Sequence, residues 1–336
     1  MKPIKTGLLA YGMSGKVFHA PFIEQHPDFE LTSIVERSKD QAIKDYPNIK
    51  HLKEIDDLLA DESIELVIVN TPNFTHYQLA KEALNAGKHV LIEKPMSVLR
   101  REAEDLFALA YRKNLKIMVY QNRRFNSDFL SVSEVLNSGR LGKIVEVHFR
   151  FDRYRTAIGP KYFKENPMPG SGILYDLGAH LIDQAISLFG MPLDFIKTYG
   201  CNRPDSQVDD YANVHLKYKN GLNVYLTANL LVADEGPAYI IHGTQGTYSK
   251  GKTDVQEDQL LAGMKPLDKG FGIEKEGSEG RLVTIDENNE KQVEAIKAPL
   301  GNYMGLFDEV SATIRQDKDY FVKQQEILAQ IDVLEK

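Results

Sequence analysis

The stretch Gly7-Leu8-Leu9-Ala10-Tyr11-Gly12-Met13-Ser14-Gly15 decides how the first part of the chain folds. Its apolar half predicts a β-strand over Gly7–Tyr11, and a helix-compatible segment begins near Lys16. Glycines at a strand-to-helix junction let the backbone approach a pyrophosphate, which then lies at the positive end of the helix. Ala10 occupies the first glycine position of the GxGxxG pattern. The match is therefore incomplete, and an ordinary turn is the alternative interpretation.

The first third of the chain alternates short apolar runs with amphipathic segments. The runs are Gly7–Tyr11, Leu31–Val35, Leu66–Val69, Val90–Ile92 and Ile117–Tyr120. This alternation predicts a doubly wound parallel sheet whose strands are joined by helices. Because the glycine pattern lies at the first strand-to-helix junction, we predict a Rossmann domain over residues 1–121 that binds NAD or NADP. The candidate pyrophosphate contacts are Gly12, Met13, Ser14 and Gly15.

The turn Glu36-Arg37-Ser38-Lys39 follows the second apolar run, and Glu36 lies 24 positions after Gly12. A ribose-binding group is expected roughly 20 residues after the glycines. Glu36 would accept hydrogen bonds from the ribose hydroxyls of NAD, whereas Arg37, Ser38 and Lys39 would hold the 2′-phosphate of NADP. Both signals are present, so the choice between NAD and NADP stays open. A solvated charged turn is the alternative.

The pattern changes after residue 121. Longer apolar runs follow, such as Ile144–Phe151 and Val224–Leu230, with connections rich in proline and glycine. They predict a second domain over residues 122–336, of the α+β class with a mostly antiparallel sheet. The stretch from Gly251 to Lys291 shows no readable pattern and is assigned no function.

Composition and charge argue against several classes of function. A net charge of −7 and a pI near 5.8 disfavour nucleic acid and anionic membranes as partners. No apolar run approaches the ~20 residues of a membrane helix, and the run after Met1 is too short for a signal peptide. The single cysteine, Cys201, is expected to be a small buried residue rather than a nucleophile, and a cytoplasmic location fits best.

Two predicted strand exits carry candidate functional groups. One apolar run leads into Asn70-Thr71-Pro72-Asn73-Phe74-Thr75-His76, and the next leads into Glu93-Lys94-Pro95. Both exits lie on the ligand side of the predicted sheet. Lys94 would supply a fixed positive charge where a substrate oxygen becomes an alkoxide during hydride transfer. The alternative is a surface lysine before a turn proline.

A predicted helix in the second domain carries an imidazole between carboxylates. Asp176, His180 and Asp183 are spaced i, i+4 and i+7, and therefore share one helical face. Such a histidine suits a general base near neutral pH, because neighbouring negative charge favours its protonated form. A structural interior histidine and a metal site are the alternatives.

Together these motifs resemble the Gfo/Idh/MocA oxidoreductase family, named for glucose–fructose oxidoreductase and inositol dehydrogenase. The most specific elements are Glu93-Lys94-Pro95 and the Asp176-x-x-x-His180-x-x-Asp183 helix, supported by Thr71-Pro72-Asn73. The resemblance covers nearly the whole chain. It implies a Rossmann domain followed by an α/β domain whose large open sheet often serves in oligomer contacts, so a homodimer or homotetramer is expected.

Further strings resemble a narrower subgroup that includes NADP-dependent scyllo-inositol 2-dehydrogenases. They are Phe18-His19-Ala20-Pro21, Asn122-Arg123-Arg124, Phe151-Asp152-Arg153-Tyr154-Arg155 and Tyr175-Asp176-Leu177-Gly178. The resemblance implies catalytic roles for Lys94, Asp176 and His180, with Asp183 in support. It implies further cofactor contacts from Thr71, Pro72, Asn73, His76, Glu93 and Lys94, and substrate contacts from Asn122, Arg124, Tyr154, Asp176 and His180.

The implied reaction is the reversible oxidation of a secondary alcohol on a cyclic sugar or polyol, without a metal. His180 would take the hydroxyl proton, Lys94 would stabilise the developing oxyanion, and Asp176 would orient the substrate and the histidine. A non-catalytic NAD(P)-binding regulator of the same fold is one alternative function, since fold does not fix function. A metal-dependent lyase or isomerase that uses the Asp176 and His180 face is another.

Overall fold

The computed structural model describes residues 2–335, and these form two compact units. The first unit contains the residues up to Asn122 together with Gln256–Phe271 and Asn302–Leu328. The second contains Arg123–Val255, Gly272–Gly301 and the residues from Ala329 onward. A single division after residue 121 does not describe the two later segments that return to the first unit. Contacts between elements far apart in the chain place them there, and no local composition signal marks them.

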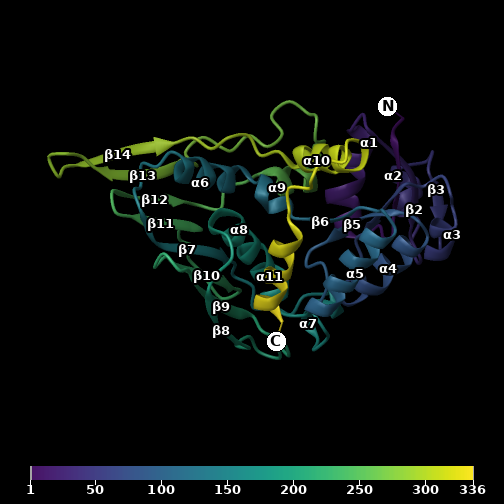
Figure 1. The fold of residues 1–336 in the computed structure, drawn as a ribbon, viewed down its shortest axis with the longest axis horizontal. Coiled ribbons are helices and arrows are strands. Elements are labelled where there is room, and N and C mark those ends of the chain that lie inside the picture. The colour runs from purple at the N-terminus through teal and green to yellow at the C-terminus, as the bar shows by residue number, and fades with distance from the viewer. Residues whose placement is uncertain (1, 336) are drawn as a thin grey trace. The chain divides into compact units, whose positions relative to one another are not determined.

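The first unit is built on a six-stranded parallel sheet in the order β3-β2-β1-β4-β5-β6 (Figure 1). This order confirms the predicted doubly wound Rossmann sheet. Every residue of β4 is buried, as expected for a central strand that is covered on both faces. The strands are β1 (Ile4–Leu8), β2 (Phe29–Val35), β3 (Lys50–Leu52), β4 (Leu66–Val69), β5 (His89–Glu93) and β6 (Ile117–Tyr120).

The helices of the first unit connect these strands or return to them from later in the chain. Among them, α4 packs against β5 and α5, while α1 packs against β2 and α10. They are the π-helical turn η1 (Ser14–His19), α1 (Ala20–Gln25), α2 (Gln41–Asp45), α3 (Ile55–Leu59), the 3₁₀ turn η2 (Asn73–Thr75), α4 (His76–Asn85), α5 (Arg100–Arg112), α9 (Gln256–Leu261) and α10 (Tyr303–Arg315). Two helices include residues of both units, η3 (Asn122–Phe125) and α11 (Gln324–Leu334).

Two details of the first sheet differ from the sequence prediction. The first strand spans Ile4–Leu8 rather than Gly7–Tyr11, because the apolar run continues into the turn after strand pairing has ended. Gly7 lies inside the strand, where a Cβ atom would come within 2.8 Å of Leu58. The short strand β3 was not predicted, since three residues at the sheet edge leave no periodic signal.

The second unit is built on an eight-stranded sheet in the order β14-β13-β12-β11-β7-β10-β9-β8. Its neighbours pair antiparallel except β7 and β10, so the predicted mostly antiparallel sheet is confirmed. The strands are β7 (Ile144–Asp152), β8 (Asp194–Gly200), β9 (Tyr211–Lys217), β10 (Asn223–Asn229), β11 (Tyr239–Gly243), β12 (Gly246–Lys250), β13 (Gly280–Ile285) and β14 (Lys291–Ile296).

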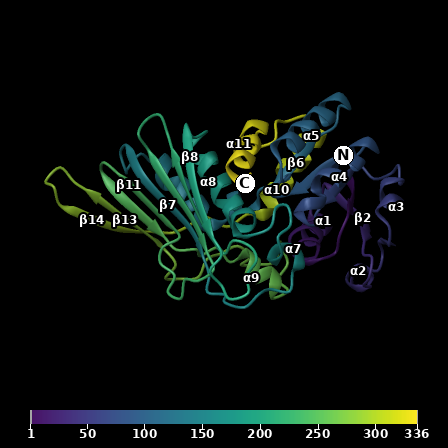
Figure 2. The ribbon, with the colours of Figure 1, turned by 90° about the horizontal axis from the view of Figure 1, so that it is seen from below.

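The strand register separates a covered face of this sheet from an open one. Val147, Val224, Leu216 and Ile241 are paired across neighbouring strands and are buried. Helix α8 (Ala179–Phe189) packs on that face against β7 and β10 (Figure 2). The remaining helices are α6 (Ser127–Asn137), α7 (Tyr162–Glu165) and the π-helical turn η4 (Leu174–Gly178).

The open face carries a row of paired side chains. Ile196, His215, Tyr225, His148 and Ile240 lie opposite one another on five adjacent strands and are exposed or half-buried. The Tyr225 ring stacks on His215 at 4.4 Å and on His148 at 5.0 Å between ring centroids. Part of the face is therefore apolar and aromatic, and it is ordered by side-chain stacking.

The expected burial of Cys201 is wrong. Cys201 is exposed and not buried, because it follows β8 in a loop where its thiol donates to the Ser206 carbonyl at 2.9 Å. Within residues 2–335, none of the helices combines the length and apolar character needed to cross a bilayer.

Candidate active site

The first strand-to-helix turn leaves room for a ligand at one glycine and for close packing at another. A Cβ atom on Gly12 would meet nothing within 4 Å, so the backbone there is open to approach. A Cβ atom on Gly15 would lie 2.3 Å from the Ala10 carbonyl oxygen and 2.8 Å from the Asn70 amide nitrogen. Gly15 is therefore required for the helix to begin close to the strand end. This division of roles matches the glycines of a dinucleotide-binding turn.

Asn70 holds the same turn from the exit of β4. Its side-chain oxygen accepts from the Ala10 N–H at 3.0 Å, and its amide nitrogen donates to the Ala10 carbonyl at 2.8 Å. The N–H and the carbonyl of Ala10, which replaces the first glycine of the pattern, are therefore both hydrogen-bonded. Asn70 was not among the predicted site residues, since its position at a strand exit was its sole signal.

The Glu93 carboxylate connects this turn to the end of β5. Glu93 Oε1 accepts a hydrogen bond from Ser14 and lies 2.9 Å from His19 Nε2. Burial raises the pKa of the Glu93 carboxyl, but the hydrogen bond and charge of His19, the Ser14 hydroxyl and the charge of Lys94 lower it more, to about 2. Glu93 is therefore ionised and fixed in place beside the half-buried Lys94.

His76 lies in the interior between the two strand exits. Its Nδ1 is 2.8 Å from the Pro95 carbonyl oxygen, and its Nε2 is 2.9 Å from the Thr71 carbonyl oxygen. The side chain is fully buried, and burial lowers the pKa of the His76 imidazole. Its two contacts tie the Thr71-Pro72-Asn73 loop to the Glu93-Lys94-Pro95 loop.

The predicted ribose-binding turn has one buried candidate, Glu36, and three exposed ones, Arg37, Ser38 and Lys39. Glu36 is 7% exposed, and its carboxylate accepts from the Ala42 N–H at 2.9 Å. The Lys53 ammonium stabilises the turn by donating to the Glu36 and Lys39 carbonyls at 3.2 and 3.1 Å. Lys53, which lies just after β3, was not among the predicted site residues.

In the second unit the three predicted helix residues are present on η4 and α8. Asp176 lies in the π-helical turn, while His180 and Asp183 lie in the first turns of α8. Isolated π-turns occur frequently at functional sites. His180 is 6% exposed and Asp183 is 3% exposed, whereas Asp176 is half-buried.

Each of the two carboxylates on this helix has a cationic partner. Asp183 accepts a bidentate pair from Arg124, at 2.9 Å from Nε and 2.7 Å from Nη2. Asp176 accepts from Lys164 of α7. Their negative charges are therefore compensated locally, which the spacing in the sequence did not reveal. Lys164 was not among the predicted site residues.

His180 lines a small cavity of about 10 Å³ in the second unit. Phe151 forms one wall, with its ring centroid 6.5 Å from that of His180 and the planes inclined by 27°. Among the described residues, three cationic side chains also line the cavity, from Arg123, Arg150 and Lys252. The polar residues Asn126, Gln184 and Tyr239, together with the apolar Leu181, complete the lining. A cavity of this volume has room for about one water-sized group, so its lining suits a single hydroxyl or carbonyl oxygen of a ligand.

The other predicted substrate residues lie in different settings. Asn122 is buried in η3, and the Arg124 guanidinium is engaged with Asp183. Tyr154 is 64% exposed and forms an isolated antiparallel bridge with Leu231. Within residues 2–335, no three histidine, cysteine, aspartate or glutamate side chains come together as a metal-binding group.

Comparison with known proteins identifies the family. Residues 4–121 match the model of an oxidoreductase family with an NAD-binding Rossmann fold, and residues 129–249 match the GFO/IDH/MocA C-terminal domain. The chain belongs to the Gfo/Idh/MocA family of oxidoreductases. The predicted family membership is thereby confirmed.

Individual members of the family resemble the chain over almost its full length. The uncharacterized oxidoreductase C115.03 of Schizosaccharomyces pombe is 39% identical, over 100% of this chain and 96% of its own. The scyllo-inositol 2-dehydrogenase (NADP(+)) IolW of Bacillus subtilis is 34% identical, over 99% of this chain and 92% of its own. The solved structure of YvaA from Bacillus subtilis superposes with a TM-score of 0.94 at 33% identity, covering 99% of this chain and 94% of YvaA.

The low pKa of Glu93 predicts a specific dependence of stability on pH. A carboxyl whose folded-state pKa is about 2, against an ordinary value of 4.5, stabilises the fold above pH 4.5, and this contribution is lost as the pH falls toward 2. Glu93→Gln removes it. Between pH 7 and pH 3, the free energy of unfolding of the natural protein should therefore fall by about 2 kcal/mol more than that of the variant. Denaturant unfolding at both pH values measures the difference, and equal decreases would contradict the role assigned to Glu93.

Proposed function

We propose that this oxidoreductase is an NAD(P)-dependent dehydrogenase that reversibly oxidises a secondary alcohol of a cyclic sugar or polyol, with an inositol among the first substrates to test. The observation that carries the proposal is the buried His180 in a small cavity lined by cationic and amide side chains. The NAD-binding Rossmann family match and the relative named scyllo-inositol 2-dehydrogenase support it.

The residues of the first unit fit a nicotinamide dinucleotide. The open backbone at Gly12, with Met13, Ser14 and Gly15, would hold the pyrophosphate, and the Thr71-Pro72-Asn73 loop with Glu93 and Lys94 would line the nicotinamide end. His76 would act through its contacts with the two loops, because its ring is buried between their carbonyls. When bound, the cofactor supplies hydride acceptance or donation.

The chain's own residues would supply positioning and proton transfer. His180 would take the hydroxyl proton during oxidation and return it during reduction. Lys94 would place a fixed positive charge on the oxygen as it becomes an alkoxide. Asp176, paired with Lys164, would orient the substrate and the histidine, and the Arg124–Asp183 ion pair would fix the helix that carries them. Asn122, Arg124 and Tyr154 remain predicted substrate contacts.

A panel of inositols, hexoses and pentoses with NAD and with NADP tests the proposed function directly. The expected result is formation of the reduced cofactor, followed by its absorbance, with at least one cyclic polyol or sugar. Chelator should leave the rate unchanged, because Lys94 would supply the positive charge that a metal otherwise provides. Tight cofactor binding without turnover of any member of the panel would favour a regulator. A rate that is lost in chelator and restored by zinc or magnesium would favour the metal-dependent lyase or isomerase.

Lys94 and His180 should affect turnover far more than cofactor affinity. Lys94→Met keeps the side-chain length but removes the charge, and it should lower kcat by roughly 10²–10³. His180→Asn should lower kcat by roughly 10²–10⁴ and remove the decline of oxidation at low pH, because the amide cannot accept the proton. Lys113→Met, at an exposed helix end, is the matched control and should leave kcat unchanged. Near-normal turnover in either site variant would exclude its proposed role.

We infer that NADP is preferred over NAD. The Glu36 carboxylate is buried and bonded to the Ala42 N–H, whereas Arg37 and Ser38 are exposed where a 2′-phosphate would lie. Arg37→Ala should weaken NADP binding by roughly tenfold, since a charge-assisted hydrogen bond contributes about 1.5–3 kcal/mol, and should leave NAD affinity nearly unchanged. Fluorescence titration with both reduced cofactors measures this, and equal losses would refute the placement.

We further propose a cytoplasmic homo-oligomer, a dimer or tetramer, in which a second copy covers the open face of the eight-stranded sheet. The stacked row from His215 to His148 and the 52% exposed Ile196 support this assignment. Introducing Ile196→Lys together with Tyr225→Lys should shift the mass in sedimentation velocity toward the monomer. Leu261→Lys, which places the same charge on an exposed apolar residue of α9, should not. An unchanged mass in the double variant would exclude this face.

A further inference from the structure

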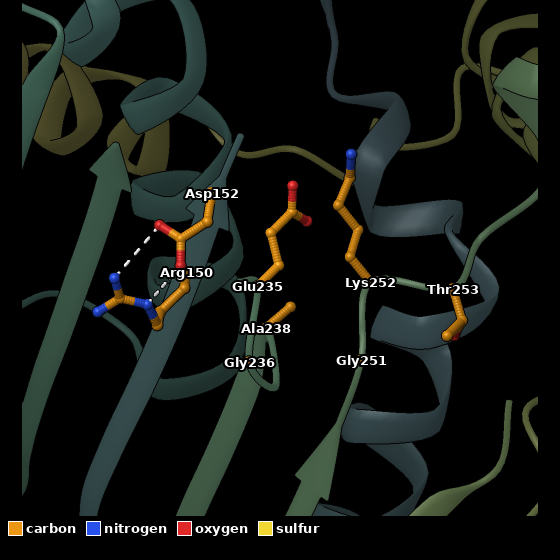
Figure 3. A pocket seen from close by; sticks show the side chains of 8 residues that line it. All are labelled: Arg150, Asp152, Glu235, Gly236, Ala238, Gly251, Lys252 and Thr253. Carbon is orange, nitrogen blue, oxygen red and sulfur yellow. Dashed lines mark hydrogen bonds and ion pairs between the residues drawn. The ribbon is translucent and has the colours of Figure 1, made fainter. Parts of the chain in front are cut away.

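A second cavity, of about 220 Å³, lies within the second unit at one end of the eight-stranded sheet. Arg150 and Asp152 line it from the end of β7, Glu235 from the loop before β11, and Lys252 and Thr253 from the segment after β12. Figure 3 draws the Glu235 carboxylate between Asp152 and Lys252, with the Arg150–Asp152 pair beside them. Two of these residues belong to the 251–291 stretch, to which the sequence pattern assigned no function.

This cavity adjoins the one that contains His180. Arg150 and Lys252 line both cavities. The Lys252 ammonium lies 4.1 Å from the centroid of the Phe151 ring, and the same ring faces His180 at 6.5 Å. A ligand group at His180 and a group in the larger cavity would therefore be neighbours, separated by side chains that contact both.

The charges that line the larger cavity are balanced. Arg150 and Lys252 contribute two cations, and Asp152 and Glu235 contribute two carboxylates. Arg150 Nε already donates to Asp152 Oδ2 at 2.6 Å, which compensates one pair directly. A site without net charge offers little to a phosphate or carboxylate. It does offer alternating donors and acceptors, which suit hydroxyl groups because each hydroxyl both donates and accepts.

Hydrogen bonds to buried groups fix the walls before any ligand binds. The Thr253 and Asp254 N–H groups both donate to Asp128 Oδ2, at 2.9 and 3.0 Å, and the Thr253 hydroxyl donates to Glu274 at 2.7 Å. Glu274 in turn accepts from the fully buried Lys250 at 2.6 Å. The segment that carries Lys252 is thus held at both sides, and such preorganisation lowers the entropic cost of binding.

The wall that carries Glu235 is also held in place by a backbone hydrogen bond to the sheet. The Arg150 N–H donates to the Ala238 carbonyl at 2.7 Å, which pins the end of the loop that carries Glu235. The volume of about 220 Å³ lies below the ~300–1,000 Å³ of pockets for drug-sized ligands, and it is of the size that a single ring requires.

We propose that this cavity is a subsite for a second sugar ring, so that the substrate is a disaccharide or a glycosylated cyclic polyol whose reacting ring lies at His180. The proposal rests on the dehydrogenase function proposed above. Glu235 and Asp152 accept hydrogen bonds from the hydroxyls of the second ring, and Lys252 and Arg150 donate to its oxygens. These residues determine specificity and take no part in the chemical step.

Calorimetry and kinetics on the full chain test the subsite together. The probes are myo-inositol, glucose and methyl α-glucoside as single rings, and galactosyl-myo-inositol, maltose, cellobiose and trehalose as two-ring ligands. At least one two-ring probe should bind at least about tenfold tighter than its reacting ring alone, and kcat/KM should rise in parallel, since each hydrogen bond to a charged group contributes at least that factor. Glu235→Gln should remove this advantage and change single-ring binding less than twofold, because Glu235 lines the larger cavity and not the one at His180. Glu235 is exposed, so the fold should tolerate the change.

The control is Glu287→Gln, the same substitution at an exposed turn between β13 and β14, which should change neither class of probe. Equal affinity for one-ring and two-ring probes would overturn the subsite, as would equal losses for both in Glu235→Gln. A preference for glucose 6-phosphate over every disaccharide would overturn it in favour of an anion site. Two-ring binding that depends on Glu235 but occurs without turnover would leave the subsite standing and refute the dehydrogenase. Turnover of single rings with no two-ring advantage would support the dehydrogenase and refute the subsite.

Discussion

The interactions of the half-buried Glu93 carboxylate hold together the parts of the first unit on which the proposed chemistry depends. On one side Glu93 is bonded to Ser14 and faces His19, in the π-helical turn that follows the open backbone at Gly12. On the other side it precedes Lys94 in the chain. An ionised group in this position is costly unless donors surround it; the Ser14 hydroxyl and the His19 imidazole do so and, with the charge of Lys94, lower the pKa of Glu93. Glu93 thus connects the first strand-to-helix turn with the end of β5.

The second unit uses a similar arrangement around its own helix. Asp183 is locked by the two-pronged contact with Arg124, and Asp176 is held by Lys164, so the helix that carries His180 is fixed by ion pairs at both ends of the motif. Charged pairs of this kind add little net stability when buried, but they fix orientation. Orientation is what a proton-transfer residue requires. The alternation of buried and open residues in the sheet then leaves one face for the helix and the other free.

The sequence reveals the fold of the first unit almost completely and the site only in part. The apolar runs near Leu66 and Ile117 became strands at the predicted residues, because burial on both faces leaves an uninterrupted hydrophobic signal. The edge strand β3 and the start of β1 at Ile4 were not predicted, since neither depends on a hydrophobic run of its own. The return of α9 and α10 to the first unit depends on packing between distant segments, which no local pattern encodes.

The partners of the site residues could not be predicted for the same reason. Spacing placed Asp176, His180 and Asp183 on one helix face. Their neighbours come from other segments of the second unit: Lys164 contacts Asp176, and Arg123 and Lys252 line the cavity at His180. The proposed hydride transfer can be followed with a cyclic polyol or sugar deuterated at its ring carbons, by NMR of the cofactor after the reaction. One deuterium is expected at the nicotinamide C4 for each molecule oxidised. Consumption of the polyol without deuterium in the cofactor, or no consumption of any deuterated inositol or sugar, would contradict it.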